Sequence, residues 1–185
     1  MEKGIAIITG ADGGMGQEIT LALAKDGFQI IMACKEPEKA YPVCERIKEE
    51  SGNEQIEVRG IDLSSLSSVH AFAQKILAEG RPVSRLMNNA GVLTTHIRPT
   101  VDGLETIVSV NYVGPYLLTR LLLPLMHKGT RIVNTVSCTY AIGKIESDFF
   151  TKGKNGRFNR ISVYGNTKLA LLLFTRELAE RGKEK

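Results

Sequence analysis

The sequence has no tryptophan, only three cysteines and three histidines, and no long hydrophobic run. Cys34, Cys44 and Cys138 are scattered without CxxC spacing, which argues against a disulfide framework and is typical of a reducing compartment. The histidines are isolated, and no His, Cys and carboxylate group has metal-ligand spacing, so we expect no metal. The sequence also lacks a signal peptide and the ~18 apolar residues of a membrane span. We therefore expect a cytoplasmic protein without a membrane span.

The composition is that of a folded globular protein. Hydrophobic residues make up 43% and charged residues 24% of the 185 residues, which excludes wholesale disorder. The length favours a single domain that spans residues 1–185. The net charge of +4 suits an anionic ligand but is too small to indicate nucleic-acid binding by itself.

Short apolar segments alternate with longer segments of helical periodicity. The expected strands cover residues 4–9, 29–34, 55–61, 85–88 and 130–137. The expected helices cover residues 16–26, 38–50, 64–79, 100–126 and 162–181, and a long loop covers 138–161. This alternation predicts a doubly wound α/β fold, in which a parallel sheet of strand order 3-2-1-4-5 lies between two helix layers. Ligands of such folds bind at the carboxyl ends of the strands, where the candidate residues should lie.

The segment 9–16 (TGADGGMG) joins the first expected strand to the first expected helix. Gly10 allows the tight turn, Gly14 removes a Cβ where backbone approaches a pyrophosphate, and Gly16 lets the helix pack on the strand. The free N–H groups of the helix N-terminus favour phosphate. The segment therefore predicts a dinucleotide site.

The second expected strand ends in Cys34, Lys35 and Glu36. A site for NAD usually has a carboxylate here for the ribose 2′-hydroxyl, whereas a cation can pair with the 2′-phosphate of NADP. Lys35 therefore favours NADP, with NAD also possible, although the charge of Glu36 lies close by.

Polar residues follow the other expected strands, as Asp62-Leu63 and as Asn88 to Gly91. Tyr164 and Lys168 have i, i+4 spacing, which places them on one face of the last helix. An ammonium one turn away favours the phenolate, so that the tyrosine can act as an acid or a base.

Taken in order, these motifs resemble the short-chain dehydrogenases/reductases over nearly the whole chain. The motifs are TGxxxGxG at 9–16, Asp62, NNAG at 88–91, Asn111, Ser137 and Tyr164-xxx-Lys168. The segments ACK at 33–35 and GKI at 143–145 resemble the retinol-dehydrogenase-like branch, which generally prefers NADP.

The resemblance implies a Rossmann fold and a role for each residue. Tyr164 exchanges a proton with the substrate oxygen, Ser137 orients that oxygen, Lys168 supports Tyr164 and binds the nicotinamide ribose, and Asn111 holds a relay water. The residues expected to bind the cofactor are Thr9, Gly10, Gly14, Met15, Gly16, Lys35, Asp62, Leu63, Asn89, Ala90, Gly91, Tyr164 and Lys168. The implied reaction is hydride transfer between NADP(H) and a small alcohol, ketone or aldehyde, by a chain that we expect to be a homo-oligomer. Family members continue into further strands and a Pro-Gly loop, so the resemblance also implies that the fold is incomplete at its C-terminus.

Two other functions are compatible with the sequence. A truncated or degenerate relative could bind NADP without catalysis and act as a sensor or interaction partner, but such a protein has no need for the complete Asn, Ser, Tyr and Lys set. Nucleic-acid binding through the basic residues Lys152, Lys154, Arg157 and Arg160 is the less favoured alternative, because the loop lacks interleaved aromatics beyond Phe158.

Overall fold

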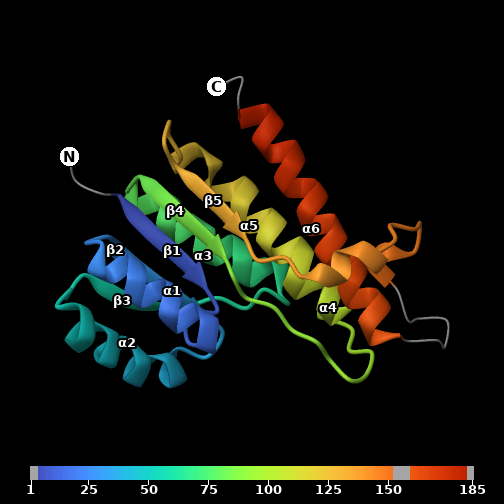
Figure 1. Ribbon diagram of the computed structural model, residues 1–185, viewed down its shortest axis with the longest axis horizontal. Coiled ribbons are helices and arrows are strands. Elements are labelled where there is room, and N and C mark those ends of the chain that lie inside the picture. Colours follow the sequence, from blue (N-terminus) through green and yellow to red (C-terminus); the bar gives the residue numbers. More distant parts are fainter. Residues whose placement is uncertain (1–3, 152–158, 183–185) are drawn as a thin grey trace.

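The structure is a computed structural model that describes residues 4–151 and 159–182, with a parallel sheet between two layers of helices (Figure 1). The strands are β1 (Ile5–Thr9), β2 (Gln29–Cys34), β3 (Ile56–Gly60), β4 (Val83–Asn88) and β5 (Arg131–Asn134). The α-helices are α1 (Gly14–Lys25), α2 (Pro37–Ser51), α3 (Leu66–Glu79), α4 (Thr106–Val108), α5 (Gly114–Leu122) and α6 (Arg160–Gly182). The remaining helical turns are η1 (Ser109–Val113, a π-helix) and the 3-10 turns η2 (Leu123–Leu125), η3 (Cys138–Ile142) and η4 (Phe149–Thr151).

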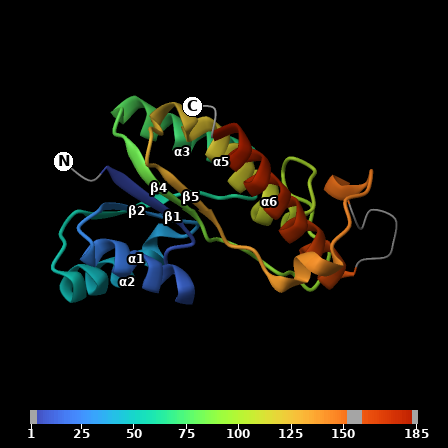
Figure 2. The same cartoon turned by 45° about the horizontal axis from the view of Figure 1, so that its top comes forward.

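The sheet confirms the predicted topology. Its strand order is β3-β2-β1-β4-β5, and all neighbouring strands are parallel. Alternate residues of the central strands face opposite helix layers, so Ile7 and Ile31 pack with α3 and α5, whereas Ile8 and Met32 pack with α1 and α2. Burial on both faces explains why β1 and β2 are continuously apolar in sequence. The view in Figure 2 shows α1 and α2 on one side of the sheet and α3, α5 and α6 on the other.

The segment 100–126 differs most from the sequence prediction. Its first residues form a loop rather than a helix, since Gly103 adopts a positive φ of 76° and Glu105 caps α4 by accepting a hydrogen bond from the Val108 N–H at 3.1 Å. The helix then widens into the π-helical turn η1, which a continuous apolar periodicity does not reveal.

Smaller differences affect element ends. The last expected strand stops at Asn134 rather than Ser137, and the loop expected over 138–161 contains the turns η3 and η4. Ser65 caps α3, because its side chain accepts a hydrogen bond from the Ser68 N–H. In the described part of the chain, no helix has the length and apolar character to cross a membrane, and no three His, Cys or acidic residues cluster as metal ligands would.

Candidate active site

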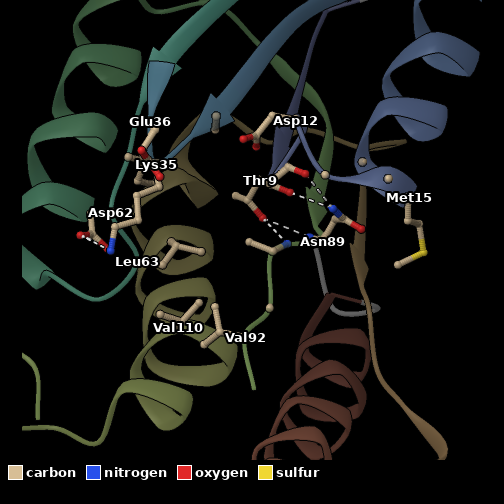
Figure 3. A pocket seen from close by; sticks show the side chains of 18 of the residues that line it. Thr9, Asp12, Met15, Lys35, Glu36, Asp62, Leu63, Asn89, Val92 and Val110 are labelled. Atoms are coloured by element: carbon tan, nitrogen blue, oxygen red, sulfur yellow. Dashed lines mark hydrogen bonds and ion pairs between the residues drawn. The ribbon is translucent and has the colours of Figure 1, made fainter. Parts of the chain in front are cut away.

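A cavity of about 400 Å³ opens at the carboxyl ends of β1 to β4, where the strand order reverses (Figure 3). It is lined by every residue predicted to bind the cofactor except Tyr164 and Lys168. The sequence reasoning named Glu36 only as a nearby charge and missed the other lining residues, which are Asp12, Gly13, Ala33, Ile61, Val92, Thr106 and Val110. Asp12 could have been found, because it lies in a segment that follows a predicted strand.

The glycine loop has the geometry that its sequence predicts. Gly10 has a φ of +62°, which L side chains rarely adopt, and a Cβ there would lie 3.0 Å from the Cα of Ala90. A Cβ on Gly16 would lie 2.1 Å from the Gly10 carbonyl oxygen, so only glycine lets α1 approach β1 this closely. A Cβ on Gly14 would meet nothing within 4 Å. Since Gly14 lines the cavity, this open space leaves room for a ligand.

Hydrogen bonds fasten the glycine loop to the end of β4. The Thr9 hydroxyl oxygen accepts hydrogen bonds from the backbone N–H groups of Asn89 and Ala90, both at 3.1 Å. The Asn89 side-chain amide donates to the carbonyl oxygens of Thr9 at 3.1 Å and Gly10 at 3.2 Å. These bonds hold the two strand ends in one arrangement, so the loop is preorganised.

Charged side chains occupy the end of the cavity that lies at the carboxyl ends of β2 and β3. The Lys35 ammonium lies 3.0 Å from a carboxylate oxygen of Asp62, whose other oxygen accepts hydrogen bonds from Ser64. Burial alone raises the pKa of Asp62, but the Ser64 hydrogen bonds and the Lys35 charge outweigh it and lower the pKa below its usual value. Burial and the neighbouring Asp12 raise the pKa of the Cys34 thiol to about 12, so this cysteine is an inert part of the core.

Two of the four predicted catalytic residues, Asn111 and Lys168, lie next to the cavity, beyond Gly91. A Cβ on Gly91 would lie 3.5 Å from the Asn111 side-chain oxygen and 3.7 Å from the Lys168 ammonium. The Asn111 carboxamide oxygen accepts a hydrogen bond from the Val92 N–H at 2.8 Å, and its nitrogen donates to the Val92 carbonyl at 3.0 Å. The π-helical turn thus aims Asn111 at the chain segment that leaves the cavity.

Lys168 is fully buried at this point. Its ammonium donates a hydrogen bond to the Thr135 carbonyl oxygen at 2.7 Å and lies 5.4 Å from the centre of the Tyr164 ring. Desolvation lowers the pKa of Lys168. A buried ammonium with a shifted pKa beside a cavity is a candidate functional group.

Close packing between η3 and α6 brings Ser137, the residue before η3, to the region of Tyr164 and Lys168. A Cβ on Gly143 would lie 2.6 Å from the Gly165 carbonyl oxygen, and one on Gly165 would lie 2.7 Å from the Thr139 carbonyl oxygen. Asn166 adds a hydrogen bond, since its side-chain oxygen accepts from the Lys144 N–H at 2.7 Å. The sequence reasoning missed Gly165 and Asn166, although both lie between Tyr164 and Lys168.

Thr139 is a further residue that the sequence did not indicate. Its backbone N–H and its hydroxyl donate hydrogen bonds to the Ser137 hydroxyl oxygen at 3.3 and 3.1 Å. Both bonds engage the oxygen as an acceptor, which leaves the Ser137 O–H free to donate to a ligand.

Three of the four basic residues considered for nucleic-acid binding, Lys152, Lys154 and Arg157, lie outside the described residues. Arg160 is exposed at the start of α6.

Comparisons with known proteins agree with this geometry. The family model for short chain dehydrogenase matches residues 4–185. Retinol dehydrogenase 12 of Mus musculus is 40% identical over 179 residues, which are 96% of this chain and 56% of that protein. Human retinol dehydrogenase 11 is 39% identical over 181 residues, with 97% and 56% covered.

Solved structures are similar as well. An uncharacterised protein from Mycobacterium paratuberculosis has a TM-score of 0.84 at 35% identity, with 97% of this chain and 63% of that chain covered. A metagenomic short-chain oxidoreductase in complex with NADP has a TM-score of 0.74 at 25% identity, with 100% and 78% covered.

The chain belongs to the short-chain dehydrogenase family. Within that family it is similar to retinol dehydrogenases, and it spans about half the length of the curated relatives that it matches.

Proposed function

We propose that this chain transfers hydride between NADP(H) and an alcohol or carbonyl compound. The observation that carries the proposal is the junction at Gly91, where the glycine-loop cavity meets Asn111 and the buried Lys168. The space beside Gly14 and the free N–H groups at the start of α1 fit a pyrophosphate, so the chain's own residues fit a dinucleotide. When bound, the nicotinamide cofactor supplies or accepts the hydride.

The protein's share of the chemistry is binding, orientation and proton transfer. The Ser137 hydroxyl donates a hydrogen bond to the substrate oxygen, and the Tyr164 phenol gives its proton to that oxygen in reduction and takes one in oxidation. The buried Lys168 ammonium lies 5.4 Å from the centre of the Tyr164 ring, where it can hold the phenol in place and bind the ribose of the cofactor. The names of the retinol dehydrogenase relatives support an alcohol and aldehyde pair as the substrate class.

Lys35 supports NADP(H) over NAD(H). It lines the cavity at the end of β2, where a 2′-phosphate needs a cation, and no carboxylate stands at position 34. A charge-assisted contact to a phosphate contributes about 1.5–3 kcal/mol when it is well formed. The structure of a related oxidoreductase with NADP also supports this preference.

The proposal is tested by separating proton transfer from binding. In Tyr164→Phe, NADPH-dependent carbonyl reduction should fall by about 10²–10⁴-fold, because the general acid is lost. NADPH affinity, measured by fluorescence titration, should stay near the original value, since the other predicted contacts remain. Lys168→Ala should reduce both activity and affinity.

Tyr41→Phe is the matched control, because Tyr41 is an exposed tyrosine of α2 outside the cavity lining. Near-native turnover in Tyr164→Phe would remove Tyr164 as the acid. If the original chain binds NADPH but reduces no carbonyl compound, the hydride-transfer proposal fails and a nucleotide-binding role replaces it.

A further inference from the structure

The ammonium of Lys35 is already paired within the cavity. Its Nζ lies 3.0 Å from Oδ2 of Asp62. The dashed line in Figure 3 marks this ion pair, whose residues extend from the ends of neighbouring strands, β2 and β3. Oδ1 of Asp62 is held by the Ser64 N–H at 2.8 Å and the Ser64 hydroxyl at 2.6 Å. Ser64 therefore fixes the carboxylate with its second oxygen toward Lys35.

The other charges around the cavity also limit the positive charge that Lys35 offers to a ligand. The cavity lining contains the carboxylates of Asp12, Glu36 and Asp62, and Lys35 is the only Lys or Arg among the described residues that line it. Lys39 does not add a free positive charge, because its ammonium pairs with Glu36 at 2.6 Å. The same pair neutralises Glu36, so an incoming 2′-phosphate meets a cation that Asp62 already neutralises, with the carboxylate of Asp12 as a further negative charge in the lining.

We infer that Asp62 is a specificity-determining residue that competes with the cofactor's 2′-phosphate for Lys35. The inference rests on the proposed preference for NADP(H). A nucleotide without a 2′-phosphate leaves the Lys35–Asp62 pair intact, whereas one with a 2′-phosphate must draw Lys35 away or share it. Asp62 thereby reduces the selectivity for NADP(H) over NAD(H) that Lys35 alone would give.

Asp62→Asn removes the charge and keeps the local structure. Asparagine has the same shape, and its side-chain oxygen can accept both Ser64 hydrogen bonds, while its NH₂ group cannot hold the Lys35 ammonium. The pair is partly exposed, with 65% of the Lys35 side chain and 32% of the Asp62 side chain accessible, so solvent screens it. A moderate effect is therefore expected, in the range measured for exposed ion pairs.

The experiment compares two ligands by calorimetry, adenosine 2′,5′-bisphosphate and 5′-AMP, and uses the ratio of their affinities. Both ligands make the contacts to adenine and the 5′-phosphate, so the contribution of these contacts cancels in the ratio. A general loss of nucleotide binding therefore leaves the ratio unchanged. Asp62→Asn should raise the preference for the bisphosphate by about two- to fivefold. Lys35→Ala should lower it, and adding Asp62→Asn to Lys35→Ala should raise it less than Asp62→Asn does alone.

Asp102→Asn is the control for charge, since Asp102 is exposed, caps the N-terminus of α3 by accepting from the Leu66 N–H and does not line the cavity. It should leave the ratio unchanged. If Asp62→Asn impairs folding, as judged by circular dichroism, Asp62→Ser serves as the second charge-removing variant.

The outcomes distinguish a failure of this inference from a failure of the proposed NADP(H) preference on which it rests. An unchanged ratio in Lys35→Ala overturns the NADP preference and the inference together. A lowered ratio in Lys35→Ala with no rise in Asp62→Asn overturns the inference alone. An equal rise from Asp62→Asn with and without Lys35 also overturns it, because Asp62 would then act on the phosphate directly.

Discussion

The two edges of the sheet meet solvent in different ways. At the β3 edge, Glu57 and Arg59 form an ion pair with each other at 2.7 Å. They also pair with Glu79, the last residue of α3, and with Arg81 just after it. At the β5 edge, the side chain of Val133 is 43% exposed. A groove of about 510 Å³ runs along this edge, between the segment from Leu123 to Asn134 and the last turns of α6.

Charged side chains protect an edge strand against pairing with other chains, whereas apolar residues invite it. The β3 edge, next to the nucleotide cavity, is therefore protected by its own sequence. The β5 edge adjoins α6, the helix that carries Tyr164 and Lys168, and no further strand covers it among the described residues. The half around the cavity, β1 to β4 with α1 and α2, is thus covered by its own elements, and we call it the nucleotide half after the proposed function. The half that carries the proposed catalytic residues, η1, β5 and α6, keeps open apolar surface, and we call it the catalytic half.

The largest expected effect is a loss of stability, and it tests the contrast between the buried centre of the sheet and its exposed β5 edge. Leu86 of β4 is completely buried, so Leu86→Ala should lower the free energy of unfolding by about 2–5 kcal/mol through lost burial and a cavity. Val133→Ala on the neighbouring strand β5 should cost less than about 0.5 kcal/mol, because Val133 is already exposed. Urea unfolding monitored by circular dichroism measures both. Equal losses would show that the β5 edge is covered in solution.

A smaller effect tests the glycine loop. Gly16→Ala should lower the free energy of unfolding by roughly 1–3 kcal/mol, since its Cβ would overlap the Gly10 carbonyl oxygen. Gly14→Ala should leave stability nearly unchanged and weaken nucleotide binding, because its Cβ would project into open space at the cavity. Thermal unfolding and NADPH titration of the two variants distinguish these roles. A stable Gly16→Ala variant with native affinity would contradict the close packing.

Most of the nucleotide half could be predicted from the sequence. Apolar strands that are buried on both faces and polar residues that follow them are local patterns, so the residues at the strand ends and the strand order could be inferred together. The pairing of Lys35 with Asp62 could not, because topology brings two strand ends together without specifying which side chains touch. Asn88 and Asn89 are alike in sequence, yet Asn88 donates to Thr119 and Asn134 inside the core, whereas Asn89 fastens the glycine loop.

The catalytic half depends more on tertiary packing. The π-helical turn that aims Asn111 lies inside an apolar stretch whose periodicity suggests an ordinary helix. The contact of Gly143 with Gly165 joins segments 22 residues apart, and nothing in either segment alone indicates that they touch. Sequence patterns report local periodicity, whereas such contacts are decided by how elements pack.

A third prediction uses the buried ammonium of Lys168. Because its pKa in the folded state is lowered, the unfolded chain binds more protons between that pKa and the ordinary lysine value, so stability rises as pH increases through this window. Lys168→Met removes the buried charge, so it should raise the free energy of unfolding near neutral pH, and the gain should shrink toward about pH 10 as the lysine of the original chain loses its proton. Urea unfolding at several pH values measures it. Lys128→Met, at an exposed lysine, is the control.

The smallest expected effect concerns association through the β5 edge, which follows from the expectation of a homo-oligomer. An edge strand with exposed apolar residues beside an apolar groove should pair weakly with a second copy, so the mean mass in light scattering should rise with concentration. Val133→Lys should reduce this rise, because a charge at the edge must be desolvated on pairing, and it should change stability by less than about 0.5 kcal/mol. Val101→Lys is the control, since Val101 is 87% exposed in the loop before α4, away from β5. A compact monomer at every concentration would contradict association, and equal effects of the two lysines would mean that added charge, rather than the open edge of β5, controls it.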